Sequence, residues 1–166
     1  TVALSGATSG STNFAASLAG VTATGGGTDF TSDLASATYS NGVTFSGGNM
    51  VVPDAVSGWT VTIATTSDTL DEANETATLT VGGTAGTLTI TDDDVQPTVT
   101  ISDATEVAGT VTFVATLSAA SGKTITFVAD TADGTKTAGV DYTALTGSTV
   151  TFNPGETTKN IVVTAL

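Results

Sequence analysis

The sequence contains no cysteine, no histidine and no arginine, and it contains only three lysines. Without cysteine and histidine the chain cannot form a disulfide framework, a typical structural zinc site or a nucleophile–histidine pair. Three lysines cannot neutralise a run of phosphates, which argues against nucleic-acid binding. The net charge of −13 also argues against an anionic membrane surface.

Long apolar runs are absent as well, so we expect no segment that spans a bilayer. The sequence has no initiator methionine and no signal peptide, and we therefore expect it to be part of a longer protein. Aromatic residues make up only 5%, and charged residues only 11%. Hydrophobic residues nevertheless reach 39%, and the mean hydropathy is +0.28, which argues against a disordered acidic tail.

Threonine and glycine dominate what is present, with 39 and 19 residues of 166. A chain rich in threonine, valine and glycine favours strands over helices. Apolar and threonine residues alternate with a period of two, as in 76–81, 87–91 and 124–129, and turn residues separate these runs. We predict strands at 1–5, 11–18, 41–45, 59–65, 75–81, 86–91, 98–102, 110–118, 123–130, 148–152 and 159–166, with an extra strand before or after 41–45. The predicted fold class is all-β, in the form of an antiparallel sandwich with one solvent-exposed face.

The chain also repeats itself. Residues 27–30 match 139–142, residues 43–45 match 150–152, and residues 59–62 resemble 161–164. We place the boundary after Asp94, which predicts a domain over 1–94 and a second over 95–166. The comparison predicts that the first domain lacks its first strand and that the second lacks its last two. Such open sandwiches would expose edges that pair with neighbouring repeats or with strand-donating copies.

Most of the acidic residues fall on loops that the predicted topology places at one end of each sandwich. In the first domain these loops are the one around 29, the segment 68–75 and the segment after the last strand, and in the second they are the loops around 106 and 141. The loops at the opposite end, 7–10, 82–86 and 119–122, carry no carboxylate. Carboxylates gathered at one end repel each other, and a calcium ion, which takes 6–8 oxygen ligands, removes that repulsion. An alternative is that the acidic triplet 92–94 is only a solvated linker.

A family resemblance becomes visible at these residues. The segment from Asp133 to Tyr142 reads Asp-Gly-Thr-Lys-Thr-Ala-Gly-Val-Asp-Tyr, and Phe152-Asn-Pro-Gly-Glu follows it. Together with the Glu-x-x-Gly step at Glu106 and the acidic segments 68–75 and 92–94, it resembles the Calx-beta repeat. Lys136, where alanine is usual, is a departure from this pattern. Residues 1–67 match that repeat less well. Their segments Gly25-Gly-Gly-Thr-Asp-Phe30 and Tyr39-Ser-Asn-Gly-Val-Thr-Phe45, followed by the acidic segment 68–75, resemble the calcium-dependent immunoglobulin-like extender repeats of bacterial RTX adhesins.

The resemblance implies a fold, a ligand set, a setting and a partner. The implied fold is all-β, with tandem antiparallel immunoglobulin-like (Calx-beta-type) β-sandwiches. It implies calcium as the cofactor, export by type I secretion to the bacterial cell surface, and long tandem stalks. It also implies that calcium ions bind at domain junctions. Carried over residue by residue, the implied calcium ligands are Asp29, Asp68, Glu72, Glu75, Asp92, Asp93 and Asp94 in the first domain, and Glu106 and Asp141 in the second.

Other functions remain open on the sequence. Catalysis is not expected, because the sequence shows no tuned acid–base pair and few aromatic residues for a sugar platform. We interpret Trp59, which alternates with Val61 and Ile63, as a core residue. Threonine arrays such as 76–80 and 87–91 could bind ice or glycan, although threonine is also a good strand former. A regulatory calcium sensor is a further alternative, and its calcium affinity would distinguish it from an extracellular module.

Overall fold

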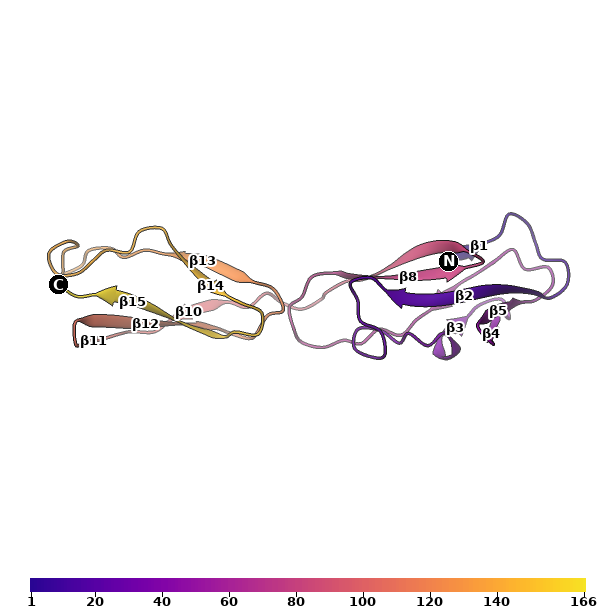
Figure 1. The fold of residues 1–166 in the computed structure, drawn as a ribbon, viewed down its shortest axis with the longest axis horizontal. Coiled ribbons are helices and arrows are strands. Elements are labelled where there is room, and N and C mark those ends of the chain that lie inside the picture. The colour runs from indigo at the N-terminus through magenta and orange to yellow at the C-terminus, as the bar shows by residue number, and fades with distance from the viewer. The chain divides into compact units, whose positions relative to one another are not determined.

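The structure is a computed structural model that describes residues 1–166 (Figure 1). The chain forms two compact units: unit 1 comprises Thr1–Asp68 and Asn74–Asp92, and unit 2 comprises Thr69–Ala73 and Asp93–Leu166. The only helical element is a short 3-10 turn, η1 (Leu34–Ser36), and every other element is a strand. All strand pairs are antiparallel, which confirms the predicted all-β fold. No helix in the structure has the length and apolar character needed to cross a membrane.

Unit 1 is built around a five-stranded sheet with the order β4-β5-β2-β8-β9. The strands are β2 (Thr12–Gly20), β4 (Thr44–Ser46), β5 (Asn49–Val52), β8 (Glu75–Val81) and β9 (Thr84–Ile90). Two short pairs complete the unit: β1 (Val2–Ala3) with β6 (Gly58–Trp59), and β3 (Thr38–Tyr39) with β7 (Val61–Thr62).

The core of unit 1 lies under this sheet. Trp59, with only 1% of its surface exposed, packs with Met50, Val52 and Val81, which confirms its predicted place in the core. A smaller cluster joins Phe30 and Ala77 of β8 to half-buried residues of β2 and β9. Alternation therefore places one face of each strand in the core and leaves the threonine-rich face outside.

Unit 2 has a four-stranded sheet and a separate two-stranded one. In the first, β12 (Thr110–Leu117) pairs with β10 (Val99–Ile101), β11 (Glu106–Val107) and β15 (Thr158–Thr164). In the second, β13 (Ile125–Ala129) pairs with β14 (Ser148–Phe152). Ala115, Leu117, Ile125 and Phe152 form the buried core between the two sheets.

The internal repeat is confirmed by hydrogen bonds that recur between loop and strand. In unit 1 the Gly27 N–H donates to the Phe30 carbonyl at 3.0 Å, and the Thr66 N–H donates to the Asp29 carbonyl at 2.9 Å. In unit 2 the corresponding bonds run from Gly139 to Tyr142 at 2.8 Å and from Leu166 to Asp141 at 2.9 Å. The matched segments 27–30 and 139–142 therefore take the same place in the two units.

The predicted match between 43–45 and 150–152 is wrong. The strand that pairs with β2, as β14 pairs with β13, is β5, so Val52 corresponds to Phe152. A turn follows both residues, in which Ala55 (φ 61°) and Gly155 (φ 81°) occupy the left-handed region. Residues 44–46 instead form β4, an extra strand joined to β5 through Gly47 and Gly48.

A second match is also displaced, by two residues. Phe30 forms a bridge with Thr65, and Tyr142, the counterpart of Phe30, forms one with Ala165. Position 64 therefore corresponds to Thr164, where the sequence comparison placed Thr62. A shift of two residues leaves the same side chains facing the core, so alternation alone could not reveal the error.

Candidate metal centre

Asp29 and Asp141 hold equivalent loops closed in the two units. Asp29 Oδ2 accepts the Thr24 N–H at 2.5 Å, and Asp141 Oδ2 accepts the Thr137 N–H at 2.9 Å. A short acidic side chain that accepts from its own loop backbone is a common way to fix a turn. Each of these predicted calcium ligands therefore has a structural role in its loop.

Asp141 also has a cationic partner. Lys136 Nζ lies 3.1 Å from Asp141 Oδ1. The Thr137 N–H, and after it the Lys136 ammonium, hold the pKa of the Asp141 carboxyl below its usual value. Lys136, which departs from the family pattern, thus occupies one side of the carboxylate with its own positive charge.

Asp133, which the sequence reasoning did not include among the ligands, organises the same loop. Its Oδ1 atom accepts the Ala138 N–H at 2.7 Å and the Tyr142 hydroxyl at 2.9 Å. The hydrogen bond to Asp133 raises the pKa of Tyr142. The first aspartate and the tyrosine of the Asp-Gly-Thr…Asp-Tyr segment therefore bind each other.

Glu106 closes the β11–β12 turn. Its Oε1 atom accepts the Gly109 N–H at 2.5 Å, and Ala108 and Gly109 both have positive φ angles, 51° and 82°. The Glu-x-x-Gly step is thus a tight hairpin with a carboxylate cap. Glu106 and Asp141 line the same cavity of unit 2, so the structure places the two ligands predicted for the second domain at one cavity.

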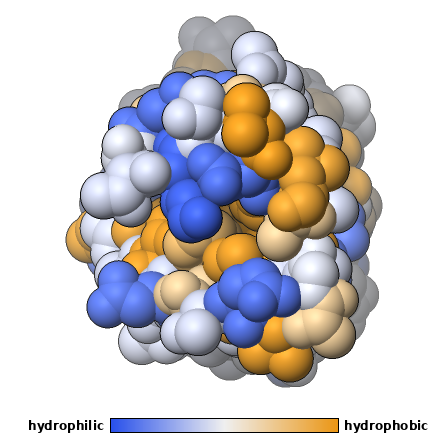
Figure 2. Space-filling view, turned by 90° about the vertical axis from the view of Figure 1, so that its left-hand side faces the viewer, coloured by the Kyte–Doolittle hydropathy of each residue, from blue (hydrophilic) through white to orange (hydrophobic).

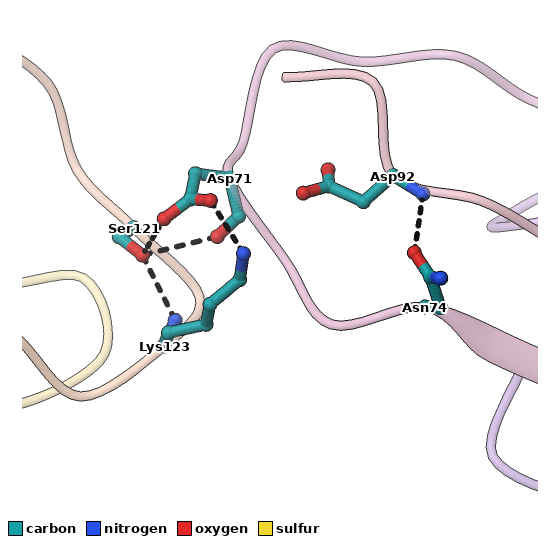
Figure 3. A network of polar contacts seen from close by, with 5 residues as sticks. All are labelled: Asp71, Asn74, Asp92, Ser121 and Lys123. Carbon is teal, nitrogen blue, oxygen red and sulfur yellow. Dashed lines mark hydrogen bonds and ion pairs between the residues drawn. The ribbon is translucent and has the colours of Figure 1, made fainter. Parts of the chain in front are cut away.

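In unit 1 the predicted ligands lie on neighbouring loops. Asp29 is bonded through its backbone to Thr66, two residues before Asp68. Glu75 begins β8 and is paired with Ile90 of β9. The Asp92 N–H donates to the Asn74 side-chain oxygen at 3.0 Å, which ties the segment after β9 to the start of β8 (Figure 3).

Asp93 and Asp94 belong to unit 2, and so does Glu72, because the segment Thr69–Ala73 is part of that unit. We call this segment the strap. Within the strap Asp71 is buried, with 3% of its side chain exposed. Its carboxylate accepts the Ser121 hydroxyl at 2.8 Å and lies 2.5 Å from Lys123 Nζ (Figure 3).

The strap is held by its backbone as well as by this carboxylate. The Gly122 N–H donates to the Asp71 carbonyl at 2.9 Å, and the Ser121 hydroxyl donates to the same oxygen at 3.0 Å. The bond with Lys123 contributes most to lowering the pKa of Asp71, and the bond with Ser121 contributes next. Asp71 was one of the acidic-loop residues in the sequence, but nothing there indicated that it pairs with a lysine 52 positions away.

All three lysines form ion pairs with carboxylates. Lys123 pairs with Asp71, Lys136 with Asp141, and Lys159 with Glu156 at 2.8 Å. The Lys159 ammonium, and after it the Asn153 N–H, lower the pKa of Glu156. The structure gathers no group of three or more acidic side chains that could hold a metal ion. The predicted calcium ligands are placed individually, and their joint action as a ligand set stays a prediction.

The loop that Asp133, Asp141 and Tyr142 organise lies in a segment that matches a known protein family. Residues 92–166 match the Calx-beta domain family. The Calx-beta match covers all strands from β10 to β15 and includes the loop that Asp133, Asp141 and Tyr142 organise. No curated protein and no solved structure matches the chain.

Proposed function

We propose that the chain is a calcium-binding structural repeat from the stalk of an extracellular bacterial adhesin, either secreted or held at the cell surface. The observation that carries the proposal is the Calx-beta match at 92–166, a family of non-catalytic, calcium-binding β-sandwich modules. The recurring loop of unit 1 supports it, because it extends the same architecture to the first half of the chain. Neighbouring repeats, or copies that donate strands, would be its protein partners.

Calcium would act by removing repulsion between carboxylates. The chain carries 16 acidic residues against three lysines, and each lysine is already paired. The proposed ligands in unit 1 are Asp29, Asp68, Glu75 and Asp92, and those in unit 2 are Glu72, Asp93, Asp94, Glu106 and Asp141. Carboxylate oxygens are the ligands that calcium prefers, and calcium tolerates irregular cages.

The test is a thermal melt in calcium and in EDTA at fixed ionic strength. Trp59 is the only tryptophan and lies in the core of unit 1, so its fluorescence reports on that unit. A ligand at 100 times its Kd that binds only the folded state adds about 2.7 kcal/mol, which raises the midpoint by several degrees. An unchanged midpoint would remove calcium from the proposed function.

Matched variants locate the sites. Asp93→Asn and Glu72→Gln should each weaken calcium binding measured by calorimetry. Asp54→Asn is the control, because Asp54 accepts the Gly10 N–H at 2.7 Å in unit 1 and the amide oxygen of asparagine can do the same. Equal affinities in all three variants would show that Asp93 and Glu72 are not ligands.

The calcium affinity distinguishes a stalk from a sensor. An extracellular module responds at about 0.1–1 mM calcium, whereas a regulatory sensor responds near the micromolar range. A Kd near one micromolar would therefore favour a cytosolic regulatory role over the stalk.

A further inference from the structure

Unit 2 contains a large cavity between its two sheets. The cavity has a volume of about 1120 Å³, and its walls are mainly apolar, with Val99, Ile101, Phe113, Phe127 and Ile161 among the lining residues. Val99 and Ile101 are 36% and 49% exposed, which is a high solvent exposure for apolar strand residues that line a cavity. Figure 2 shows the surface of unit 2 at the end where the C-terminus lies, and there apolar and hydrophilic side chains are side by side.

The corresponding region of unit 1 is filled by the hairpin β8–β9. Phe30, the counterpart of Tyr142, is fully buried there and packs with Ala77 of β8 and Leu88 of β9. Val81 of β8 is buried in the main core. In unit 2 Tyr142 lines the cavity instead. The cavity therefore lies where the first unit places two strands.

The edge of the sheet repeats the same difference. In unit 1 β2 pairs with β5 on one edge and with β8 on the other, where Ala16–Gly20 face Ala77–Val81. In unit 2 the register makes 125–128 the counterpart of 12–15, and 129–133 the counterpart of Ala16–Gly20. The second edge of 129–133 presents backbone N–H and carbonyl groups that no strand of this chain meets, and residues 129–132 line the apolar cavity.

We propose that this cavity is a docking groove for a β-hairpin with the chemistry of β8–β9, which adds to the free edge of residues 129–133. The occupant is a threonine-rich hairpin with small and aliphatic side chains at alternate positions, as in Ala77, Leu79 and Val81. Main-chain hydrogen bonds to 129–133 would provide affinity, and these alternate side chains would fill the groove. The proposal builds on the repeat partners of the proposed function, but it needs no calcium, so each can fail without the other.

Charge is compatible with this occupant. Between Glu75 and Ile90 the hairpin carries a single charged residue, Glu75 itself. The charged residues that line the groove, Glu106, Asp130, Lys136 and Asp141, include one lysine against three carboxylates. A nearly neutral hairpin with its one carboxylate at the end of its first strand avoids most of that repulsion, whereas an acidic segment would meet it.

The test extends the full chain with a second copy of residues 74–92, joined to Leu166 by a Gly/Ser linker as long as segment 66–74. Tethering gives the hairpin an effective concentration in the millimolar range. The experiment is run in EDTA. We expect amide hydrogen exchange in residues 129–133 to slow at least tenfold relative to the unextended chain. Unchanged exchange in 129–133, or protection elsewhere in the chain only, would overturn the proposal.

Controls separate docking from unspecific stabilisation. An extension with Leu79→Asp and Leu88→Asp in the added copy should give no protection. In the groove wall, Val99→Asp should reduce the protection at least tenfold, whereas Val162→Asp, which is 50% exposed and does not line the groove, should leave it within twofold. Equal effects of the two valine variants would also contradict the proposed groove. Dimerisation seen by sedimentation would show that a second copy of the chain, and not the added hairpin, occupies the groove.

Discussion

At the scale of single residues, the acidic side chains form two groups, according to the donors from which their carboxylate oxygens accept hydrogen bonds. Asp29, Asp133, Asp141 and Glu106 accept backbone N–H groups of their own loops. Asp71 accepts a hydroxyl and an ammonium in a buried position. A carboxylate has several acceptor positions, so a loop-fixing carboxylate can hold its loop and still face an ion. Loop closure thus aims these side chains before any ligand arrives.

Lys136→Ala should free one side of Asp141. The pKa of Asp141 should rise toward its ordinary value but not reach it, because the Thr137 N–H, the larger cause of the lowering, remains. Stability should change by less than about 1 kcal/mol, since the ion pair is exposed. The pKa is measured by NMR titration of the carboxyl carbon. If Asp141 is a calcium ligand, calorimetry should show tighter binding by unit 2, and an unaltered pKa would show that the lysine does not act on Asp141.

Asp71→Ala should destabilise unit 2 by about 1–3 kcal/mol, because it removes the buried carboxylate that accepts from the Ser121 hydroxyl and from Lys123 Nζ. The exposed Asp103→Ala is the control. Hydrogen exchange in β12 and β15 measures the stability of this unit.

The effect of Asp71 should depend on pH with a definite sign. Its pKa is lowered in the folded chain, so its contribution is complete above the ordinary pKa of about 3.8 and is lost as the pH falls through the lowered value. The difference between the wild type and Asp71→Ala should therefore narrow in acid. An equal difference at pH 7 and pH 2.5 would assign the effect to packing rather than to charge.

At the scale of elements, close backbone approach decides where glycine is needed. A Cβ atom at Gly20, the last residue of β2, would lie 1.9 Å from the Ala23 carbonyl oxygen. At Gly86, within β9, the nearest atom would be the Leu79 carbonyl oxygen at 4.0 Å. The tight return of the chain after β2 leaves no room for a side chain, whereas β9 has room.

Gly20→Ala should therefore lower the free energy of unfolding of unit 1 by about 1–3 kcal/mol. The matched Gly86→Ala should be neutral or stabilise by up to about 1 kcal/mol, since glycine weakens a strand interior. Urea denaturation followed by Trp59 fluorescence checks both. Similar losses in the two variants would contradict the steric account.

Alternation predicted most strands near their observed places, and the loop match 27–30 with 139–142 was confirmed by hydrogen bonds. Residues 43–45 were matched to the wrong strand of the second repeat, because Val-Thr-Phe recurs by composition in a chain so rich in strand formers. The Gly47–Gly48 turn that joins β4 to β5 has no counterpart in the second repeat. The Asp71–Lys123 pair could not be predicted either, since it depends on tertiary folding that joins distant segments.

At the scale of the whole molecule, the chain passes from one unit to the other after Asp68, after Ala73 and after Asp92. Three of the proposed calcium ligands, Asp68, Asp92 and Asp93, stand at these points of the sequence. Calcium bound by these residues should reduce the number of free torsions in the connecting segments. Small-angle scattering should then show a narrow, extended distance distribution with calcium and a broader, shorter one in EDTA. Identical distributions would limit calcium to a role in folding.

The pairing of every lysine has a consequence for the solution around the protein. With a net charge of −13 and no unpaired lysine, the surface field is anionic, and a diffuse cloud of mobile cations must accompany the protein. At about 0.01 M ionic strength this cloud extends roughly 30 Å, and any divalent ion enriched in it would mimic site binding. At physiological salt it contracts to about 8 Å, and magnesium becomes the matched competitor. A stabilisation by calcium that persists at physiological salt and in the presence of magnesium is due to specific coordination by the proposed ligands. A stabilisation that disappears under these conditions is due to the diffuse cation cloud.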